Sequence, residues 1–190
     1  MEYFMLNIIT YIEKKTIDSF FFTQTSSREY FISLNSHLSV QVANKSLEKN
    51  KGHKLDGVVF IEISNHTITS FMDWDDIDLM WIGILEMILD YKKSGFGVHS
   101  MAMNSHEWSF KRIITKPENK IIFKVKRNPL LFEGTNLYEA YKETKMVTVE
   151  KVFLSEIIKA AKDFISFREK LIKMDSLSRL KTLIFEINAN

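Results

Sequence analysis

Four aspartates lie within six consecutive positions, where they could bind a metal ion: Asp73, Asp75, Asp76 and Asp78. Carboxylates this close repel one another, and a divalent cation such as Mg²⁺, Mn²⁺ or Ca²⁺ would relieve that repulsion. The same residues also suit the start of a helix, because aspartate caps exposed N–H groups and complements the helix dipole. We favour the capping interpretation.

Two histidines and a glutamate follow this corner at His99, His106 and Glu107. If a turn joins two strands here, both imidazoles and the carboxylate would approach one another and, with a corner aspartate, form a metal or general-base site. The spacing of the histidines does not match HExxH, and the spacing of the four aspartates does not match an EF-hand loop. Isolated turn histidines are the commoner outcome, so we expect no catalytic residue, no metal and no cofactor.

A predicted β-hairpin from 107 to 127 carries lysines on its outer face. A four-residue loop, Lys116–Asn119, would place Lys111 opposite Lys124, and like charges in that position destabilise a sheet. A nearby acidic residue or an acidic partner should offset them, although a solvated basic face is the simpler interpretation. The candidate partner-binding residues are Lys111, Lys124, Lys126, Arg127 and Trp108.

Arg112 belongs to the inner face of the same predicted hairpin, opposite Phe123. A buried guanidinium without a carboxylate is costly, so we expect a corner aspartate or Glu62 to contact it. The alternative is a hairpin that extends past the sheet, where Arg112 would reach solvent over the ring of Phe123.

The composition excludes several classes of protein. The sequence has no cysteine, which rules out disulfides, thiol catalysis and cysteine-bound zinc. The net charge of +2 does not favour nucleic-acid binding in general, and no Gly-rich phosphate loop is present. We found neither a secretory signal nor an apolar run that would span a membrane, so we expect a cytoplasmic protein that binds no membrane.

The elements that position these residues surround a central hairpin and helix. Val58–Ile63 and Thr67–Met72 read as two strands, and Ile77–Tyr91 is a helix that is apolar almost all round, which predicts burial on several sides. Before this centre we predict a helix at Met1–Lys15, with a strand as the alternative, strands at Ile17–Thr23 and Tyr30–Val42, and a loop at Ala43–Lys54. After it we predict a strand at Lys145–Phe153 and helices at Ser155–Lys173 and Ser176–Ile187.

This order of elements predicts one α+β domain over residues 1–190. We expect a mostly antiparallel sheet, packed by the buried central helix and a long C-terminal helix. Strands and helices do not alternate as they do in parallel α/β folds.

The hairpin, the acidic corner with Trp74, the buried helix with Trp81 and the later Leu154-Ser155-Glu156 before a long helix form a recognisable series. Over roughly Gly57 to Phe167 this series resembles small immunity proteins of bacterial toxin systems. The resemblance implies a single α+β domain that binds and blocks a cognate toxin. The near-neutral charge departs from the acidic character expected of nuclease inhibitors.

Our leading expectation is therefore a non-catalytic protein-binding module, an immunity or inhibitor protein whose partner is toxin-like. The first alternative is a metal-dependent hydrolase that uses the aspartate corner with His99, His106 and Glu107. The second is a nucleic-acid-binding accessory protein that uses four basic residues of the hairpin: Lys111, Lys124, Lys126 and Arg127.

Overall fold

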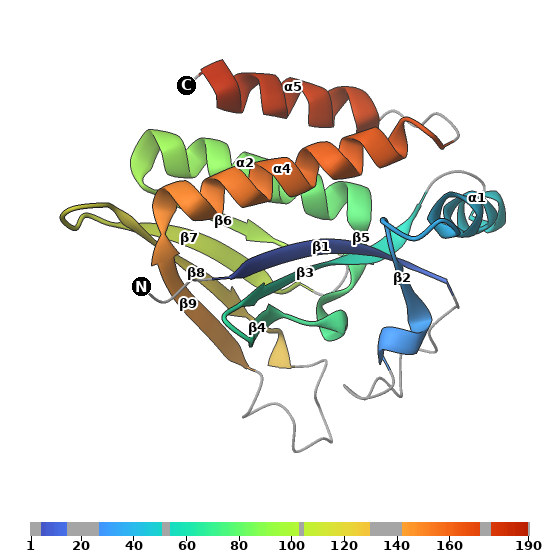
Figure 1. Ribbon diagram of the computed structural model, residues 1–190, viewed down its shortest axis with the longest axis horizontal. Helices are drawn as coiled ribbons and strands as arrows, with labels where there is room; N and C mark the ends of the chain where they lie inside the picture. Colours follow the sequence, from blue (N-terminus) through green and yellow to red (C-terminus); the bar gives the residue numbers. More distant parts are fainter. Residues whose placement is uncertain are drawn as a thin grey trace.

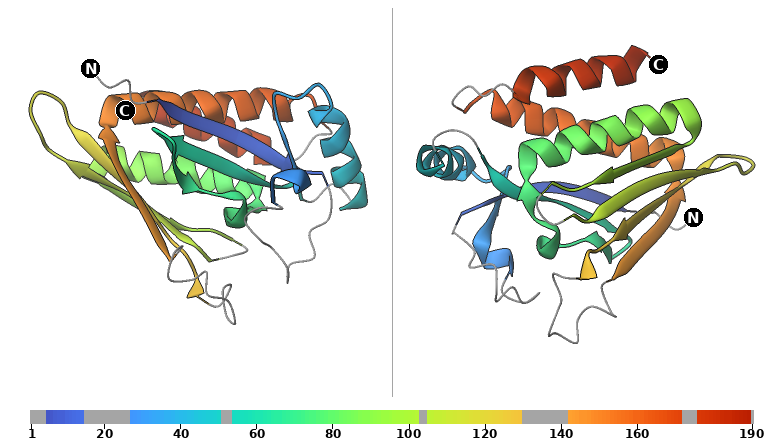
Figure 2. Two further views of the ribbon diagram at one scale, coloured as in Figure 1. Left: turned by 60° about the horizontal axis from the view of Figure 1, so that its bottom comes forward. Right: turned by 180° about the vertical axis from the view of Figure 1, so that it is seen from behind.

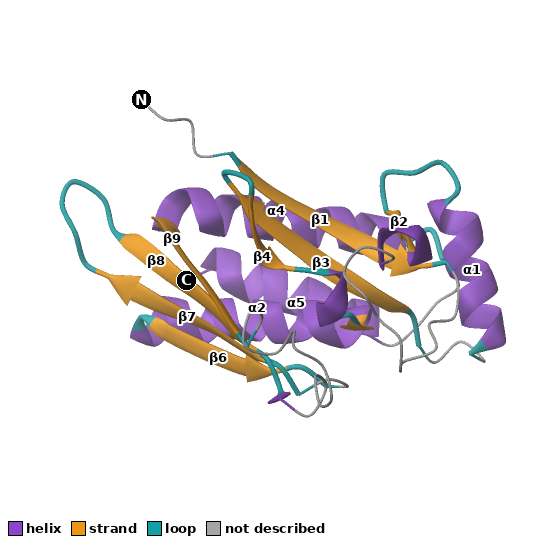
Figure 3. Ribbon diagram, turned by 90° about the horizontal axis from the view of Figure 1, so that it is seen from below, coloured by secondary structure: helices purple, strands orange, loops and turns teal. Residues whose placement is uncertain are grey.

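The computed structural model describes residues 5–14, 27–50, 54–102, 105–129, 142–171 and 176–189. In these residues the chain forms two antiparallel sheets, and three helices, α2, α4 and α5, lie on the same side of both sheets (Figure 1, Figure 2). Seen from below, both sheets lie in front of the helices (Figure 3). The predicted α+β class with antiparallel sheets is confirmed.

The first sheet has the strand order β2-β1-β3-β4, and the short β5 also pairs with β3. Its strands are β1 (Leu6–Glu13), β2 (Phe31–Ser33), β3 (Asp56–Ile63), β4 (His66–Thr69) and β5 (Asp75–Asp76). Alternate residues point to opposite faces of a strand, so Ile12 and Ile61 are buried beneath the helices. On the same face Thr10 accepts a hydrogen bond from Nε1 of Trp81 at 3.2 Å.

The second sheet has the order β6-β7-β8-β9. Its strands are β6 (Phe96–Ser100), β7 (Glu107–Ile113), β8 (Lys120–Lys126) and β9 (Glu143–Val149). Trp108, Phe110 and Phe123 alternate onto the face that meets the helices, and all three are fully buried. The opposite face of this sheet, which we call the outer face, carries the intervening residues.

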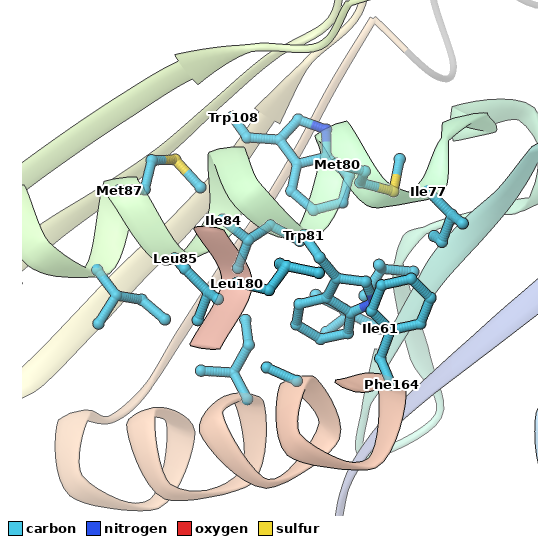
Figure 4. Close-up of a cluster of buried hydrophobic side chains, with 14 of the residues drawn as sticks. Ile61, Ile77, Met80, Trp81, Ile84, Leu85, Met87, Trp108, Phe164 and Leu180 are labelled. Carbon is cyan, nitrogen blue, oxygen red and sulfur yellow. The ribbon is translucent and has the colours of Figure 1, made fainter. Parts of the chain in front are cut away.

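Helix α2 (Ile77–Ser94) lies at the centre of the core, as its sequence predicts. Asp76 caps its first turn, and Gly95 ends it with a φ of 78°, a left-handed conformation that favours glycine. Trp81 and Ile84 are fully buried, and the Trp81 ring stacks on Phe164 with the ring centroids 6.1 Å apart (Figure 4). Burial on several sides explains why the helix has almost no polar face.

Helices α4 (Glu150–Arg168) and α5 (Ser176–Ala189) complete the helical layer. Helix α4 contributes Phe164 to the cluster around Trp81, and α5 contributes Leu180 from the other side (Figure 4). Lys92 of α2 donates a hydrogen bond to the backbone carbonyl of Ile187 at 2.6 Å, which fixes the end of α5. Helix α4 begins at Glu150, directly after β9, so the predicted end of the strand at Phe153 and the predicted start of the helix at Ser155 are both wrong.

Three further predictions near the N-terminus need correction or cannot be tested. Residues 6–13 form strand β1, not the predicted helix, because β1 pairs with β2 on one side and β3 on the other. Helix α1 (Ser39–Lys49) replaces the predicted end of the Tyr30–Val42 strand and the predicted loop. The predicted strand Ile17–Thr23 lies outside the described residues. Two 3-10 helices, η1 (Ser27–Tyr30) and η2 (Phe71–Asp73), complete the described elements.

Candidate functional site

The four corner aspartates point to different partners and do not form a shared site. Asp76 accepts hydrogen bonds from two backbone N–H groups of the first turn of α2, at 3.0 and 3.3 Å. Asp75 accepts the backbone N–H of Asp76 at 2.7 Å. Asp78 pairs with Arg168 at 2.8 Å, and both side chains are buried. The capping interpretation is confirmed for Asp76, and Asp73 has a different role.

Asp73 is the centre of a fully buried charge cluster. Arg127 donates to its two carboxylate oxygens at 2.7 and 2.6 Å, and His106 Nδ1 lies 3.0 Å from Oδ1. The backbone N–H of Ser70 donates to Oδ2 at 2.7 Å, which closes a capping box at η2. Burial on its own raises the pKa of Asp73, but the charge of Arg127 and the hydrogen bonds from His106 and Arg127 outweigh it and lower the pKa to about 2.

This cluster joins the two sheets. Arg127 follows β8 in the second sheet, and its guanidinium also donates to the backbone carbonyl of Ile68 in β4 at 3.1 Å. Thr144 of β9 donates to the same carbonyl at 2.6 Å. The buried charges therefore hold β4 against β8 and β9, and this arrangement explains why the core contains a carboxylate and a guanidinium.

The histidines and Glu107 do not assemble a metal site with the corner. His106 is fully buried and contacts Asp73, so the expectation of an isolated turn histidine is wrong for it, but the His99 ring fills the space beside Gly83 of α2, and Glu107 is exposed on the outer face. Among the residues that the structure describes, no three His, Cys, Asp or Glu side chains are grouped so that they could hold a metal ion. The geometry offers no support for the hydrolase alternative.

Asp76 provides a test of the cap, because burial raises its pKa to about 6 and the charges of Asp78 and Asp56 act in the same direction. The folded state therefore binds the carboxyl proton of Asp76 more tightly than the unfolded state does. The stability that this proton contributes is lost as the pH rises from about 4 to 6. Asp76→Asn keeps the cap and removes the buried charge. We expect the variant to be more stable than the parent by about 1–2 kcal/mol at pH 7, and about equal at pH 4.

Urea unfolding of both proteins at the two pH values measures this difference. The low pKa of Asp73 affects parent and variant alike, so it cancels in the comparison. A parent that is the more stable protein at pH 7 would show that the ionised Asp76 stabilises the helix.

The outer face of the second sheet is where exposed apolar and basic side chains gather. Strand alternation places lysines and apolar residues on it, together with two glutamates, Glu107 and Glu143. The lysines are Lys111, Lys120, Lys124, Lys126 and Lys145, and the apolar residues include Phe96, Val98, Ile122 and Val147. Positive charge therefore exceeds negative charge on this face, in a protein whose total charge is close to neutral.

The strand register orders these side chains into rows. Phe96, Lys111, Ile122 and Val147 are direct neighbours across the four strands, and Phe96 and Val147 are 48% and 44% exposed. In the next row, Lys124 lies opposite Lys145. Glu143 offsets this like-charge pair, because its carboxylate meets Lys124 Nζ at 2.8 Å. Three of the four residues in the first row are apolar, and we call it the apolar row; beside it lies a row with two lysines, and together they form an amphipathic surface suited to a protein partner.

Two shallow grooves open on this surface and share Phe96 and Lys111. The first, of about 400 Å³, lies over the middle of the outer face between Glu107 and Lys145. The second, of about 430 Å³, runs towards the hairpin loop and includes Ile114, which is 85% exposed. The second groove lies at the β6 edge of the sheet, because Ser94, Gly95 and Arg112 also line it.

No family model, curated protein or solved structure matches this chain.

None of the helices in the described ranges has the length and hydropathy that a membrane crossing requires.

Two of the five predicted partner-binding residues do not lie on the surface. Trp108 is 0% exposed and packs against Phe123, with ring centroids 5.4 Å apart. Arg127 is 2% exposed and is held by Asp73. Because both are buried, neither side chain is accessible to a partner in this structure, whereas Lys111 and Lys126 are exposed and Lys124 is partly exposed on the outer face.

The predicted hairpin register is wrong by two residues. Ile113 pairs with Lys120, so the loop has six residues and Lys111 lies opposite Ile122, not Lys124. Arg112 does have a carboxylate partner, but it is Glu150 at the start of α4, at 2.9 Å, and neither a corner aspartate nor Glu62. Its guanidinium carbon also lies 4.8 Å from the centre of the Tyr91 ring.

Several residues of the surface were missed in the sequence. The sequence alone connects neither Phe96 and Val98 nor Lys145 to the predicted hairpin. The signal was alternation: Lys124 and Lys126 recur at every second position of β8, as Lys145 and Val147 do in β9. It could not be read as one surface without knowing that β8 and β9 are neighbours.

Proposed function

We propose that this protein is a non-catalytic binding module that blocks a cognate protein partner, as immunity proteins of bacterial toxin systems do. The observation that carries the proposal is the outer face, where an exposed apolar row lies beside lysines on a sheet whose other face is packed by helices. Large apolar side chains on a solvent-facing sheet mark interaction surfaces.

The chemistry of the buried groups supports the same proposal. The charged groups that sequence reasoning offered to a catalytic site are engaged in holding the fold: Asp73 joins the sheets, Asp76 caps α2 and Asp78 pairs with Arg168. Their carboxylates are directed at the protein's own groups and not at a shared cavity.

The surface defines the chemistry of the partner. Lys111, Lys124 and Lys145 favour a partner with carboxylates, and Phe96 and Ile114 favour one with exposed apolar side chains. Such a partner would meet lysines and exposed apolar side chains next to one another on one surface. The toxin-like identity of the partner rests on the sequence resemblance.

A single-stranded nucleic acid is the second candidate, because lysines on a sheet attract phosphates. Binding of this kind also uses several aromatic side chains on which bases stack. Among the described residues of the outer face, Phe96 is the only aromatic side chain. The surface therefore fits an acidic protein better than a nucleic acid.

The test is a triple charge reversal, Lys111→Glu with Lys124→Glu and Lys145→Glu. Immobilised parent protein is used to retain a partner from an extract of the host cell, and the purified partner is titrated by calorimetry against parent and variant. We expect affinity to fall roughly 100-fold, because each reversal replaces an attraction by a repulsion. A co-expression assay then asks whether the parent protects cells from that partner and the variant does not.

The matched control reverses three exposed lysines on and just after α4, on the helical side: Lys159, Lys162 and Lys170. It changes the net charge by the same amount and should leave the affinity unaltered. Equal binding by the outer-face variant and the control would overturn the proposal. Salt-sensitive binding of a single-stranded oligonucleotide that the outer-face variant loses, with no protein retained, would favour the nucleic-acid candidate.

A further inference from the structure

Strand β6 forms a free edge of the second sheet. It pairs with β7 on one side, and no other described strand pairs with it (Figure 3). Natural proteins guard such edges with lysine, proline or a bulge. The sequence of β6, Phe-Gly-Val-His-Ser, has no lysine and no proline, and its pairing with β7 runs without a bulge.

The hydrogen bonds to β7 define which backbone groups point to the free edge. Arg112 donates to the carbonyl of Gly95, and Met101 donates to the carbonyl of His106, both at 2.8 Å. Hydrogen-bonded positions alternate along an antiparallel strand, so Gly97 and His99 also face β7. The N–H and C=O groups of Phe96, Val98 and Ser100 therefore point away from the sheet.

Phe96 already has a partner for both of these groups. The Ser94 hydroxyl accepts its N–H at 3.1 Å, and the single hydroxyl hydrogen is shared between the carbonyls of Phe96 at 2.8 Å and Asp90 at 2.9 Å. Val98 and Ser100 remain, with two donors and two acceptors, and no described residue bonds to them. Both residues are exposed, so the four groups are accessible.

We propose that β6 pairs with β6 of a second copy of this chain, about a two-fold axis that passes beside His99. In this antiparallel register Val98 of each copy lies opposite Ser100 of the other, and all four edge groups of each copy gain partners. The pairing stops at Phe96, because Ser94 already forms hydrogen bonds with it. The register therefore follows from which backbone groups of the edge still lack a partner.

The side chains at the axis agree with this pairing. Only His99, beside the two-fold axis, meets its own copy, and β6 has no acidic residue, lysine or arginine that would repel the other strand. The His99 ring packs against Gly83 of its own helix α2, which directs it away from the other copy. On the outer face Val98 would pack beside Ser100. The paired sheets would present both outer faces side by side, so two partners could bind one dimer.

This inference does not rest on the proposed function, and its test needs no partner. Val98→Pro removes the N–H that points to the free edge and breaks no bond to β7, a position where an edge strand tolerates proline. Val98→Thr keeps the N–H and the branched shape and is the matched control. Sedimentation velocity of each protein, from about 10 µM to 1 mM, measures the dimer.

We expect the parent and Val98→Thr to dimerise as the concentration rises, and Val98→Pro to dimerise roughly 10- to 100-fold more weakly. Amide hydrogen exchange of Val98 and Ser100 in the parent should slow with concentration, whereas that of Gly97 and His99, bonded to β7, should not change. The exchange data decide the question if Val98→Pro does not fold. A parent that remains monomeric throughout, or a dimer that leaves the Val98 and Ser100 amides unprotected, overturns the inference.

Discussion

Replacing Arg127 by methionine is expected to lower the free energy of unfolding by about 3–5 kcal/mol, because it leaves a buried carboxylate without its main partner. The Asp73 side chain is fully buried, and Arg127 donates to both of its oxygens. Methionine fills much of the same volume, so the loss reports the charge and the hydrogen bonds more than a cavity. The carbonyl of Ile68 loses one of its donors as well.

The pH dependence separates this explanation from a simple packing defect. In the parent, the low pKa of Asp73 gives stability that is present above the ordinary pKa of 3.8 and is lost as the pH falls towards 2. Without Arg127 burial dominates and raises the pKa of Asp73, so protonation on acidification relieves the buried charge. The gap in stability between parent and variant should therefore narrow as the pH falls.

Urea unfolding with two additional variants provides the controls. Lys126→Met changes an exposed neighbour of Arg127 and should alter stability by less than about 0.5 kcal/mol. Asp73→Asn combined with Arg127→Met removes both charges and should recover part of the loss. A loss below about 1 kcal/mol for Arg127→Met alone would contradict the assignment of this pair as the link between the sheets.

The sequence predicted the elements whose signals are local. Helix α2 has apolar residues at helical spacing, an aspartate at its start and a glycine directly after its end, and the structure uses Asp76 and Gly95 in those roles. The hairpin of β3 and β4 was recognised for the same reason, since Ser64 and Asn65 turn the chain with positive φ between two β-forming runs.

Helix α1 was missed because two periods compete in its sequence. Leu38, Val40 and Val42 alternate like a strand, but the buried residues of α1 are Ser39, Ala43 and Leu47, at helical spacing of four. Small residues such as serine and alanine do not stand out as core positions in a hydrophobic pattern. The burial of residues at helical spacing, which only the tertiary fold reveals, decides between the strand period and the helical period.

The links between distant segments could not be read from the sequence. The pairs Arg127 with Asp73 and Arg168 with Asp78 join residues that lie 54 and 90 positions apart. One local signal was available: Ser70 and Asp73 have the spacing of a capping box, and the structure contains that box. This signal accounts for the position of Asp73 but not for its arginine. The same reason explains why Trp108 and Arg127 were wrongly placed on the surface.

Two glycines at the contact between α2 and β6, Gly97 and Gly83, should differ strongly in how much stability they lose on replacement by alanine. A methyl group at Gly97 of β6 would overlap the backbone carbonyl of Met87 in α2. That carbonyl cannot move away unless the whole helix shifts relative to the sheet. We expect Gly97→Ala to lower the free energy of unfolding by about 3 kcal/mol, at the upper end of the range for overpacking. It would also shift the second sheet and so disturb the outer face.

Gly83 lies within α2, where a glycine can allow a neighbouring backbone to come close. The structure shows instead that its close neighbour is the His99 side chain, which is partly exposed and can rotate away. Gly83→Ala also gains about 1 kcal/mol of helix propensity, which offsets the cost of moving the ring. We expect its stability to remain within about 1 kcal/mol of the parent.

Urea unfolding of the two variants measures the contrast directly. The comparison is matched, since each variant adds one methyl group at the contact between α2 and β6. A loss for Gly97→Ala that is as small as the loss expected for Gly83→Ala would mean that α2 can move relative to β6. In that case the backbone contact at Met87 would not set the distance between the helix and the sheet that carries the outer face.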